Sequence, residues 1–412
     1  MKIKLSSITE IVSGATPSTS VQEYYDGDVV WFTPKDLSDQ GTKYISKGER
    51  NITEDGFRNC SARMIPPYNL LMSSRAPIGL LSINEVECCT NQGFKSLIVD
   101  RSKANVDYLY YYIKHHLPEV EALGSGTTFK EVSRASLEKW DIELPDLPTQ
   151  EAIASVLSSL DRKISLNRKA NEVLESMAKQ LYDYWFVQFD FPNAEGKPYK
   201  SSGGKMVYNE TLKREIPEGW EVNTLSEIGT FRNGINYDPN EPGDAEYRIV
   251  NVRNVSSTSL LIDSSELDVL MLDEQKANTY LIKEGDILIT RSGNPGATRC
   301  YCECEIPAVY CGFIICFTPV LAIHRKYLLM FLKSREMITN NLKGGSIMPN
   351  ISQDALKPVC LPIPDTDVLK RFDDSIVPIL SKLQANLIET NRLTSLRDYL
   401  LPLLMNGQVK VS

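Results

Sequence analysis

The sequence predicts an α+β protein with two α/β domains that are related by a pseudo-two-fold axis and separated by a pair of long antiparallel coiled-coil helices. Three observations support this fold class. The chain has 412 residues, of which 42% are hydrophobic and 24% charged, as expected for a globular protein with more than one domain. Its two halves resemble each other at an offset of about 219 residues. Each half ends in a long stretch with the apolar spacing of a coiled-coil helix.

The internal repeat extends over most of the chain. At an offset of 219, "QGFKSLIV" (92–99) lies over "CGFIICFT" (311–318). At an offset of 220, "LSSI" (5–8) lies over "LSEI" (225–228). The repeat leaves out little more than residues 189 to about 216. Two copies of one folded unit are therefore expected, with a connecting segment between them.

Each copy begins with about 145 residues in which short apolar runs alternate with Gly, Pro, Asn and Asp. This pattern is typical of strands and turns with one or two helices. The expected organisation is a first domain at 1–147, a helix at 148–190, a linker at 191–216, a second domain at 217–366 and a second helix at 367–408.

Heptad spacing predicts the two long helices. Residues 149–187 contain neither Pro nor Gly, and apolar or small side chains recur there at alternating spacings of four and three. The offset of 219 gives the second helix, where Pro378 and Pro402 are expected to kink or end the helix. The predicted helix–helix seam consists of Ile153, Leu157, Leu160, Ile164, Asn167, Leu174, Leu181, Trp185, Phe372, Ile376, Ile379, Leu383, Asn386, Leu393, Leu400 and Leu404.

Asn167 and Asn386 occupy the same position in the two seams. A buried Asn costs stability but can fix the register of a coiled coil, here by pairing with its counterpart on the other helix. Alternatively, both side chains are half exposed at the edge of a wider bundle. The sequence leaves these two interpretations open.

The direction of the two helices bears on function. A whole domain lies between them, so loop length does not decide between parallel and antiparallel packing. Antiparallel packing would give the chain an internal two-fold axis, which matches the symmetry of duplex DNA. Two unlike domains related in this way are suited to recognise a split DNA sequence, with an unread stretch between its two halves.

Composition and motifs argue against several other functions. The net charge is −8, and neither domain is basic: residues 1–145 carry 16 basic and 19 acidic side chains, and residues 217–364 carry 13 and 18. Tight DNA binding by the chain alone is therefore not expected, because phosphate neutralisation dominates such affinity. The N-terminus has no signal-like segment and no apolar run could span a bilayer, so a cytoplasmic protein without a membrane partner is expected.

No catalytic or metal site is predicted. The chain has only three His, and "IPPY" (65–68) has Ile where an amino-methyltransferase needs an amide or carboxylate side chain. The segment "SSGGK" (201–205) lacks the spacing of a phosphate-binding loop. Cys300, Cys302 and Cys304 alternate along an expected strand, where free thiols usually pack as small apolar groups.

The junction between the two copies carries a family resemblance. The segment "QLYDYWFVQFDFP" (180–192), followed by "GKPYKSSGGKMVYNETLKREIPEGWE" (196–221), resembles the junction between repeats in specificity subunits of type I restriction-modification systems. The opening "LSSITEIVSGATPST" and the turns "LLMSSRAPIG" and "ILITRSGNPG" are similar to the target recognition domains of that family. The resemblance covers essentially the whole chain.

The resemblance implies a non-catalytic subunit that binds double-stranded DNA. Each target recognition domain would recognise one half of a bipartite sequence, and the helices would act as spacer. The implied partners are two N6-adenine methyltransferase subunits and two restriction subunits, and S-adenosylmethionine, ATP and Mg would bind only to those partners. Two rival functions are a coiled-coil scaffold without DNA recognition, and a methyltransferase or nuclease with its own active site.

Three repeated segments supply candidate DNA contacts: the turns after the strands, the Gly-rich loops before the helices, and "FTPKDL" (32–37) with its counterpart "VNVRNV" (250–255). Arg at a loop tip can bind guanine or phosphate, and Gly lets the backbone approach a phosphate. Alternatively, Arg75 and Arg291 pair with carboxylates, and Ser133 and Ser352 are plain helix N-caps. The candidates are Lys35, Ser74, Arg75, Thr127, Thr128, Lys130, Arg253, Asn254, Arg291, Ser292, Asn294, Lys343 and Ser346.

Overall fold

The computed structural model describes residues 2–126, 130–238, 243–257, 259–301, 307–341 and 350–411, with only the backbone for 337–341. The chain divides into two compact units. Unit 1 is Met1–Leu166 with Arg392–Ser412, and unit 2 is Asn167–Asn391. Within the described ranges, the helices are all too short or too polar to cross a membrane.

Unit 1 contains a five-stranded sheet in the order β2-β9-β6-β7-β5. Its strands are β2 (Thr9–Ser13), β9 (Lys95–Val99), β6 (Leu70–Ser74), β7 (Ile78–Asn84) and β5 (Tyr44–Ile45). Neighbours are antiparallel except β5 and β7, which are parallel. Two further pairs are β1 (Lys2–Lys4) with β10 (Asp141–Glu143) and β4 (Trp31–Phe32) with β8 (Cys89–Thr90). The domain's helices are α1 (Pro34–Gln40), α2 (Glu54–Arg58), α3 (Val106–His115), α4 (Leu117–Ala122) and α5 (Arg134–Glu138).

Unit 2 repeats this topology. Its five-stranded sheet has the order β14-β21-β18-β19-β16. The strands are β14 (Gly229–Asn233), β21 (Ile314–Pro319), β18 (Ile287–Thr290), β19 (Thr298–Tyr301) and β16 (Leu261–Ile262). As in the first sheet, neighbours are antiparallel except one pair, here β19 and β16, which are parallel. A second sheet joins β15 (Ala245–Val250), β20 (Ala308–Tyr310) and the edge strand β17 (Asp268–Leu272). The sheets are completed by β13 (Glu221–Thr224) with β22 (Cys360–Ile363) and by the hairpin β11 (Met206–Asn209) with β12 (Arg214–Pro217).

The helices of the second domain are α7 (Leu225–Ile228), α8 (Val252–Val255), α9 (Glu274–Asn278), α10 (Arg325–Asn341) and α11 (Gln353–Leu356).

The strand register confirms the repeat. Thr9 pairs with Val99 in the first sheet, and Gly229 pairs with Pro319 in the second, so both partners are shifted by 220 residues. The two domains are therefore copies of one fold. The first-domain counterpart of β17 is the segment around Ile52, which forms only isolated antiparallel bridges with Tyr25 and Val29 of β3 (Tyr25–Val29).

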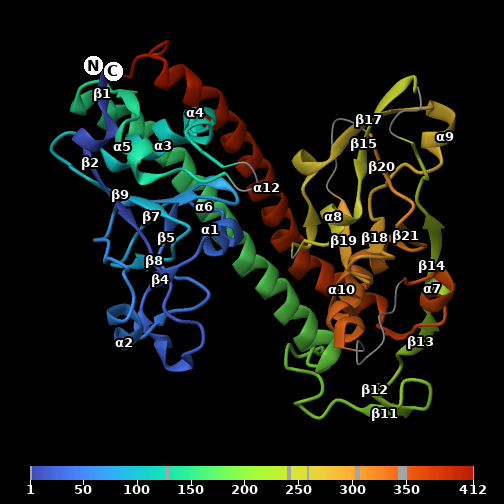
Figure 1. Cartoon of the computed structure of the whole chain (residues 1–412). Helices are drawn as coiled ribbons and strands as arrows, with labels where there is room; N and C mark the ends of the chain where they lie inside the picture. Colours follow the sequence, from blue (N-terminus) through green and yellow to red (C-terminus); the bar gives the residue numbers. More distant parts are fainter. Residues whose placement is uncertain are drawn as a thin grey trace. The chain divides into compact units, whose positions relative to one another are not determined.

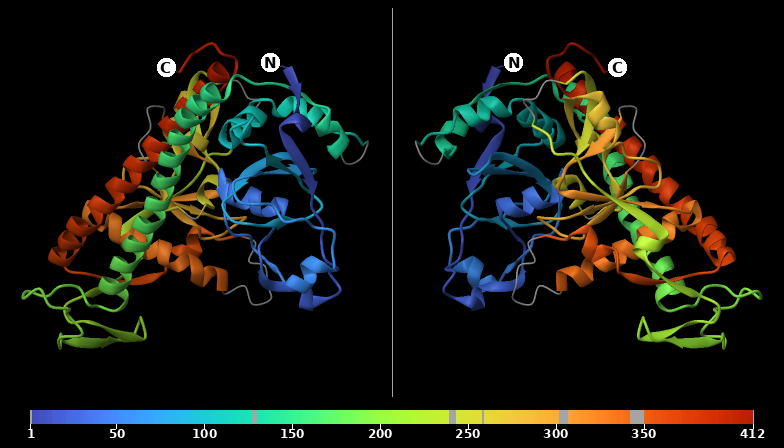
Figure 2. Two further views of the ribbon diagram at one scale, coloured as in Figure 1. Left: turned by 90° about the vertical axis from the view of Figure 1, so that its left-hand side faces the viewer. Right: turned by 90° about the vertical axis from the view of Figure 1, so that its right-hand side faces the viewer.

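The two long helices are α6 (Leu147–Tyr182), whose last turn continues as a π-helix (η3, Asp183–Val187), and α12 (Thr366–Met405) (Figures 1 and 2). Their contacts are antiparallel, because partner numbers fall along α12 as they rise along α6. The pairs are Asp161 with Arg397, Asn167 with Glu389, and Trp185 with Phe372.

Every predicted seam residue is buried or half-buried. The expected disturbance by Pro378 and Pro402 was wrong, since α12 runs through both without interruption. Burial of Phe372 and Leu404 near the two ends explains how packing can outweigh the hydrogen bond that each Pro removes.

Neither interpretation of the two Asn residues was right. Both side chains are buried, with 4% of Asn167 and 2% of Asn386 exposed, but they do not pair with each other. The Asn167 amide donates to Glu389 Oε2 (2.8 Å), and the Asn386 amide donates to Asn171 Oδ1 (2.9 Å). The antiparallel register places Asn167 opposite Glu389, about one helical turn from Asn386. Each seam Asn therefore contacts a residue about one helical turn away from the other seam Asn.

Candidate DNA interface

In the first domain, the three predicted segments lie together at the end of strand β6. The Ser74 amide donates to the carbonyl of Gly93 (2.7 Å), and the Ser74 carbonyl accepts from the amide of Val132 (2.9 Å). Arg75 forms a backbone bridge with Glu131, which brings the loop before α5 against the turn after β6. A Cβ added at Gly93 would lie 3.0 Å from Pro34 Cγ, so the start of α1 is close as well.

The second domain assembles the same segments at the end of β18. The Arg291 amide donates to the carbonyl of Phe313 (2.9 Å), and the Arg291 carbonyl accepts from the amide of Ile351 (2.8 Å). A Cβ added at Gly293 would lie 3.3 Å from Val252 Cγ1, at the start of α8. Segments far apart in the sequence thus converge in both domains.

These backbone hydrogen bonds identify which residues are equivalent. Ser74 bonds to Gly93 and Val132 as Arg291 bonds to Phe313 and Ile351. Arg291 therefore occupies the position of Ser74, and Arg75 has Ser292 as its counterpart. The similarity of the two turn sequences had suggested that Arg75 and Arg291 match, which is wrong by one residue. The irregularity between Met72 and Ser74 in the β6–β7 pairing accompanies this shift.

The side chains of Arg75 and Arg291 are half-buried. Arg291 Nη1 donates to the carbonyl of Gly312 (3.1 Å), so the guanidinium lies across the neighbouring turn. Among the described residues, neither arginine forms an ion pair with a carboxylate. The alternative of a structural carboxylate pair therefore has no support in the part of the chain that the structure describes.

Two predicted contact residues have internal roles instead. Ser74 is 0% exposed, and its hydroxyl lies 3.1 Å from the carbonyl of Gly93 and 3.4 Å from Glu131 Oε1. Asn254 is also buried; its Oδ1 accepts from the amide of Asn251 (2.9 Å) in a capping box. These side chains shape the turn and the start of α8, and as folded they are not accessible to a phosphate or base.

Lys35 and Arg253 are equivalent and exposed at the start of α1 and α8. Lys35 pairs with Glu49 (2.7 Å), and Arg253 pairs with Asp268 (2.5 Å). The hydrogen bond with Glu49 raises the pKa of Lys35. Both pairs are surface pairs of the kind that contributes little to stability, so either cation can exchange its carboxylate for a phosphate at small cost.

The Gly-rich loops are only partly described. Lys130 is exposed, whereas Ser292 and Asn294 are half-buried. Ser133 and Ser352 are N-caps: their hydroxyls accept from the amides of Ser136 (3.1 Å) and Ala355 (3.2 Å). The predicted contacts Thr127, Thr128, Lys343 and Ser346 lie outside the described residues.

Sequence reasoning missed two residues at this interface. Phe313 lies in the turn beside Arg291 and is 63% exposed. Lys95 is mostly buried and pairs with Glu131 (3.2 Å), which also lies against the Ser74 hydroxyl. In the sequence repeat, Phe313 aligns with Phe94, which is buried, so it did not stand out as an exposed residue. Lys95 lies inside an apolar strand, and no motif around it indicated a functional role.

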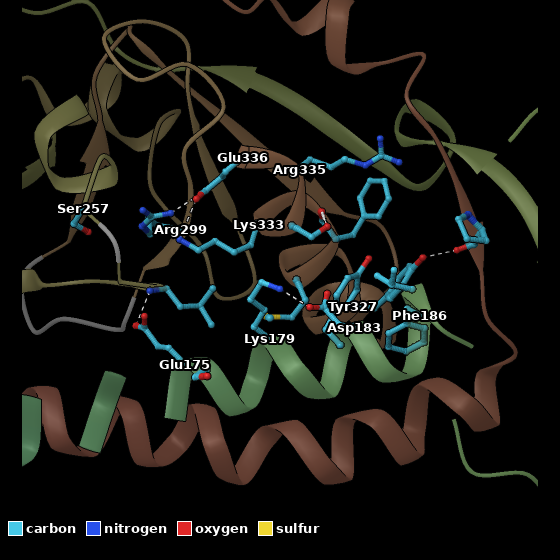
Figure 3. Close-up of a pocket in the computed structure, with 18 of the residues that line it drawn as sticks. Glu175, Lys179, Asp183, Phe186, Ser257, Arg299, Tyr327, Lys333, Arg335 and Glu336 are labelled. Carbon is cyan, nitrogen blue, oxygen red and sulfur yellow. Dashed lines mark hydrogen bonds and ion pairs between the residues drawn. The ribbon is translucent and has the colours of Figure 1, made fainter. Parts of the chain in front are cut away.

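Unit 2 also contains a cavity of about 980 Å³ between the second half of α6, helix α10 and strand β19 (Figure 3). Three of its cations pair with carboxylates of the same lining. Arg299 Nη1 lies 2.5 Å from Glu336 Oε1, Lys333 Nζ lies 3.1 Å from Glu336 Oε2, and Lys179 pairs with Asp183. Burial lowers the pKa of Lys333. The compensated charges indicate a structural role in joining α6 to the second domain.

The described residues hold no group of three or more His, Cys, Asp or Glu side chains arranged for a metal ion. Cys302 and Cys304 lie outside that part of the chain, and Cys300 is half-buried with its Sγ 3.8 Å from the carbonyl of Leu260. The geometry therefore offers polar and cationic groups at two loop clusters, one in each domain, as the candidate site.

Comparison with known proteins assigns the chain to a family. The family described as "Type I restriction modification DNA specificity domain" matches residues 1–176 and 217–397, one match for each copy of the repeat. The chain belongs to this specificity-subunit family. Membership gives it a role in DNA recognition rather than in catalysis.

Relatives of this chain include other type I specificity subunits. It is 31% identical over 418 residues to the type I restriction enzyme MjaIX specificity subunit of Methanocaldococcus jannaschii, covering 99% of this chain and 93% of that protein. It is 23% identical to the HindI specificity subunit of Haemophilus influenzae, over 68% of this chain and 72% of that protein. The crystal structure of a type I S subunit from M. genitalium shares the fold, with a TM-score of 0.61, 17% identity, and 98% and 95% coverage.

Proposed function

We propose that this specificity subunit recognises a bipartite DNA sequence, one half-site with each domain, and that the paired helices set the distance between the half-sites. One observation carries the proposal. Both domains build the same loop cluster with the same backbone hydrogen bonds, but different side chains are presented there: the first domain has a buried Ser74 followed by Arg75, and the second has Arg291 followed by Ser292. A repeated framework with unlike side chains is suited to bind two different base sequences.

We further propose that two methyltransferase subunits and two restriction subunits assemble on this chain in the cytoplasm. Those partners would bind S-adenosylmethionine, ATP and Mg and would catalyse methylation and cleavage. Exposed apolar side chains on helix α6 support a docking role: Val173, Met177 and Tyr184 recur at spacings of four and seven, on one face of the helix. A shallow groove beside them is lined by Met177, Tyr184 and, from α12, Ile379.

The net charge of −8 supports shared DNA binding. An acidic chain gains little from counterion release, so the partner subunits would supply much of the contact with the phosphates. The role of this chain would then be to select the sequence.

An insertion tests whether the helices act as the spacer. The chain is co-expressed with its methyltransferase subunits, and N6-methyladenine is mapped in the host genome. Four residues inserted after Leu166 add about one turn to α6, so the unread gap should lengthen or methylation should be lost. The matched control is the same insertion after Gly203, in the linker, where a Cβ would have no neighbour within 4 Å. An unchanged gap in the α6 variant would contradict the spacer role.

Two further experiments separate the rivals. A scaffold without DNA recognition predicts that Arg75→Ala and Arg291→Ala leave the methylated sequence unchanged. An enzyme with its own site predicts that the purified chain alone methylates or cleaves DNA. Our proposal expects a relaxed or altered half-site in the first experiment and no activity in the second.

A further inference from the structure

The turn between β20 and β21 holds an aromatic side chain outward at the candidate DNA interface. Phe313 is 63% exposed. Its backbone is fixed, because its carbonyl accepts from the Arg291 amide (2.9 Å) and the next amide, of Ile314, donates to the carbonyl of Cys311 (2.9 Å). The Arg291 guanidinium adds a bond to the carbonyl of Gly312 (3.1 Å). The ring is thus exposed on a well-anchored turn, directly beside a predicted base contact.

The first domain has no ring at the equivalent position. The Phe94 amide donates to the carbonyl of Asn91 (3.3 Å), as that of Ile314 does to Cys311, so Gly93 occupies the position of Phe313. A Cβ added at Gly93 would lie 3.0 Å from Asn91 Oδ1 and 3.0 Å from Pro34 Cγ. That spacing is tighter than nine in ten Cβ contacts in proteins, so a side chain at this position would require Asn91 or Pro34 to shift by a few tenths of an ångström. The packing around the turn therefore disfavours a ring in the first domain, whereas the second domain holds one.

We propose that Phe313 determines specificity in the second half-site by apolar contact with the C5-methyl group of a thymine in the major groove. The inference rests on the proposed function. Phe is one of the side chains that recognise this methyl group, the only apolar group that a base pair presents in the major groove. Arg291 bonds to the carbonyls of Phe313 and Gly312, and the half-buried Ser292 and Asn294 follow it in the same turn. An exposed ring next to a turn with hydrogen-bonding side chains matches a base pair that offers both a methyl group and polar atoms.

The test uses the assembled complex and duplexes that carry its mapped recognition sequence. Each thymine of the second half-site is replaced in turn by deoxyuridine, which lacks only the methyl group. With the wild-type chain, one replacement should lower the methylation rate about fourfold, the value of one buried methyl group. Phe313→Ala should methylate the unmodified duplex about tenfold more slowly and should be insensitive to that replacement.

The control variant is Val320→Ala. Val320 follows the other end of strand β21 and is 66% exposed, so its removal tests loss of exposed apolar surface away from the interface. It should respond to deoxyuridine like the wild type. Thermal unfolding of both variants should match the wild type, because both side chains are exposed.

The outcomes distinguish this inference from the proposed function. The inference is overturned if Phe313→Ala and wild type respond alike to every deoxyuridine, if Phe313→Ala slows methylation of all duplexes by one common factor, or if the second half-site contains no A·T pair. The first result leaves bipartite recognition intact. If the mapped sequence is not bipartite, the proposed function itself fails.

Discussion

The two units fix their domains to the long helices by apolar packing, but the groups that supplement this packing differ. In unit 1 they form a polar network: Lys43 of the first domain pairs with Asp107 of the same domain (2.6 Å) and donates to Ser158 of α6 (2.7 Å). Next to it, Asp161 of α6 accepts from the Tyr111 hydroxyl and from Arg397 Nη1 of α12 (2.8 Å). All of these side chains are buried or partly buried.

In unit 2 an aromatic cluster dominates the contact, beside one ion pair between Lys326 of α10 and Asp373 of α12 (3.3 Å). Phe186 at the end of α6 packs edge-on against Tyr327 of α10 and Phe372 of α12, with ring centroids 4.7 Å apart in both cases. Trp185 and Trp220 extend the cluster. An aromatic cluster is stabilised by the apolar surface area that it buries. A buried ion pair instead costs desolvation free energy, and its stability depends on the geometry of the two charged groups. The packing of one fold on its helices can therefore be supplemented by either chemistry, and the two should respond differently to mutation and pH.

Removal of an aromatic anchor should have the largest effect. Phe372 is 0% exposed and contacts both Trp185 and Phe186. Phe372→Ala leaves a cavity and should lower the free energy of unfolding by about 4 kcal/mol. Chemical denaturation measures this, with Phe313→Ala as a matched exposed Phe that should change it by less than about 0.5 kcal/mol. Equal effects of the two variants would show that the cluster does not anchor unit 2.

Breaking the ionic contact should have an intermediate effect. Asp161→Ala removes the partly buried carboxylate that Arg397 and the Tyr111 hydroxyl share, whereas Arg397 keeps its second partner, Asp398 (2.8 Å). The free energy of unfolding should fall by about 2 kcal/mol, because the Tyr111 hydroxyl and part of the guanidinium lose their acceptor.

An apolar double variant sharpens that prediction. Asp161→Leu with Arg397→Met removes both charges and should recover most of the lost stability. If the double variant is as unstable as Asp161→Ala, the packing of α6 against α12 matters more than the ion pair, and the contrast between the two units disappears.

The smallest effect concerns pH. His324 precedes α10 and is 9% exposed, and burial lowers its pKa below the usual 6.5. The unfolded chain then binds a proton that the folded chain does not, so unit 2 should lose stability as pH falls through about 6.5. The equivalent residue of the first domain, Asn105, is uncharged and caps α3 by accepting from the Tyr108 amide (3.0 Å).

His324→Asn therefore gives the second domain the uncharged residue that the first domain has at this position. Between roughly pH 7 and 5 the variant should lose less stability than the wild type, by less than about 1 kcal/mol. Thermal unfolding at several pH values measures the difference. If the unfolding temperatures of wild type and His324→Asn change with pH in parallel, His324 binds protons equally in the folded and unfolded chain.

The sequence predicted the repeat and the helices well, because both leave regular patterns. Heptad spacing depends on neighbours along one helix, so each seam residue could be named in advance. The effect of Pro402 could not, because packing of residues such as Leu404 against unit 1 decides whether the helix continues. The Asn167 contact also depends on the register of two helices more than 200 residues apart in the chain.

The candidate site was predicted in outline only. Three pairs of segments were expected to matter, and the structure brings them together within each domain. The roles of single residues depended on distant partners. Ser74 is buried against Gly93 and Glu131, which are distant in the sequence. Arg75 was matched to the wrong residue, because the pairing of β6 with β7 is irregular between Met72 and Ser74 and moves the turn by one residue relative to its counterpart. Side-chain direction at a turn has no periodic signal in the sequence.

The backbone bonds at Ser74 and Arg291 have a consequence for evolution. Because main-chain bonds close the sheet at that position in both domains, the same framework holds a buried Ser in one domain and a half-buried Arg in the other. The gene can therefore encode unlike side chains there, provided that each finds a partner within its own turn, as Ser74 and Arg291 do. Preferences for new target sequences can therefore accumulate by drift and selection while the inherited architecture persists.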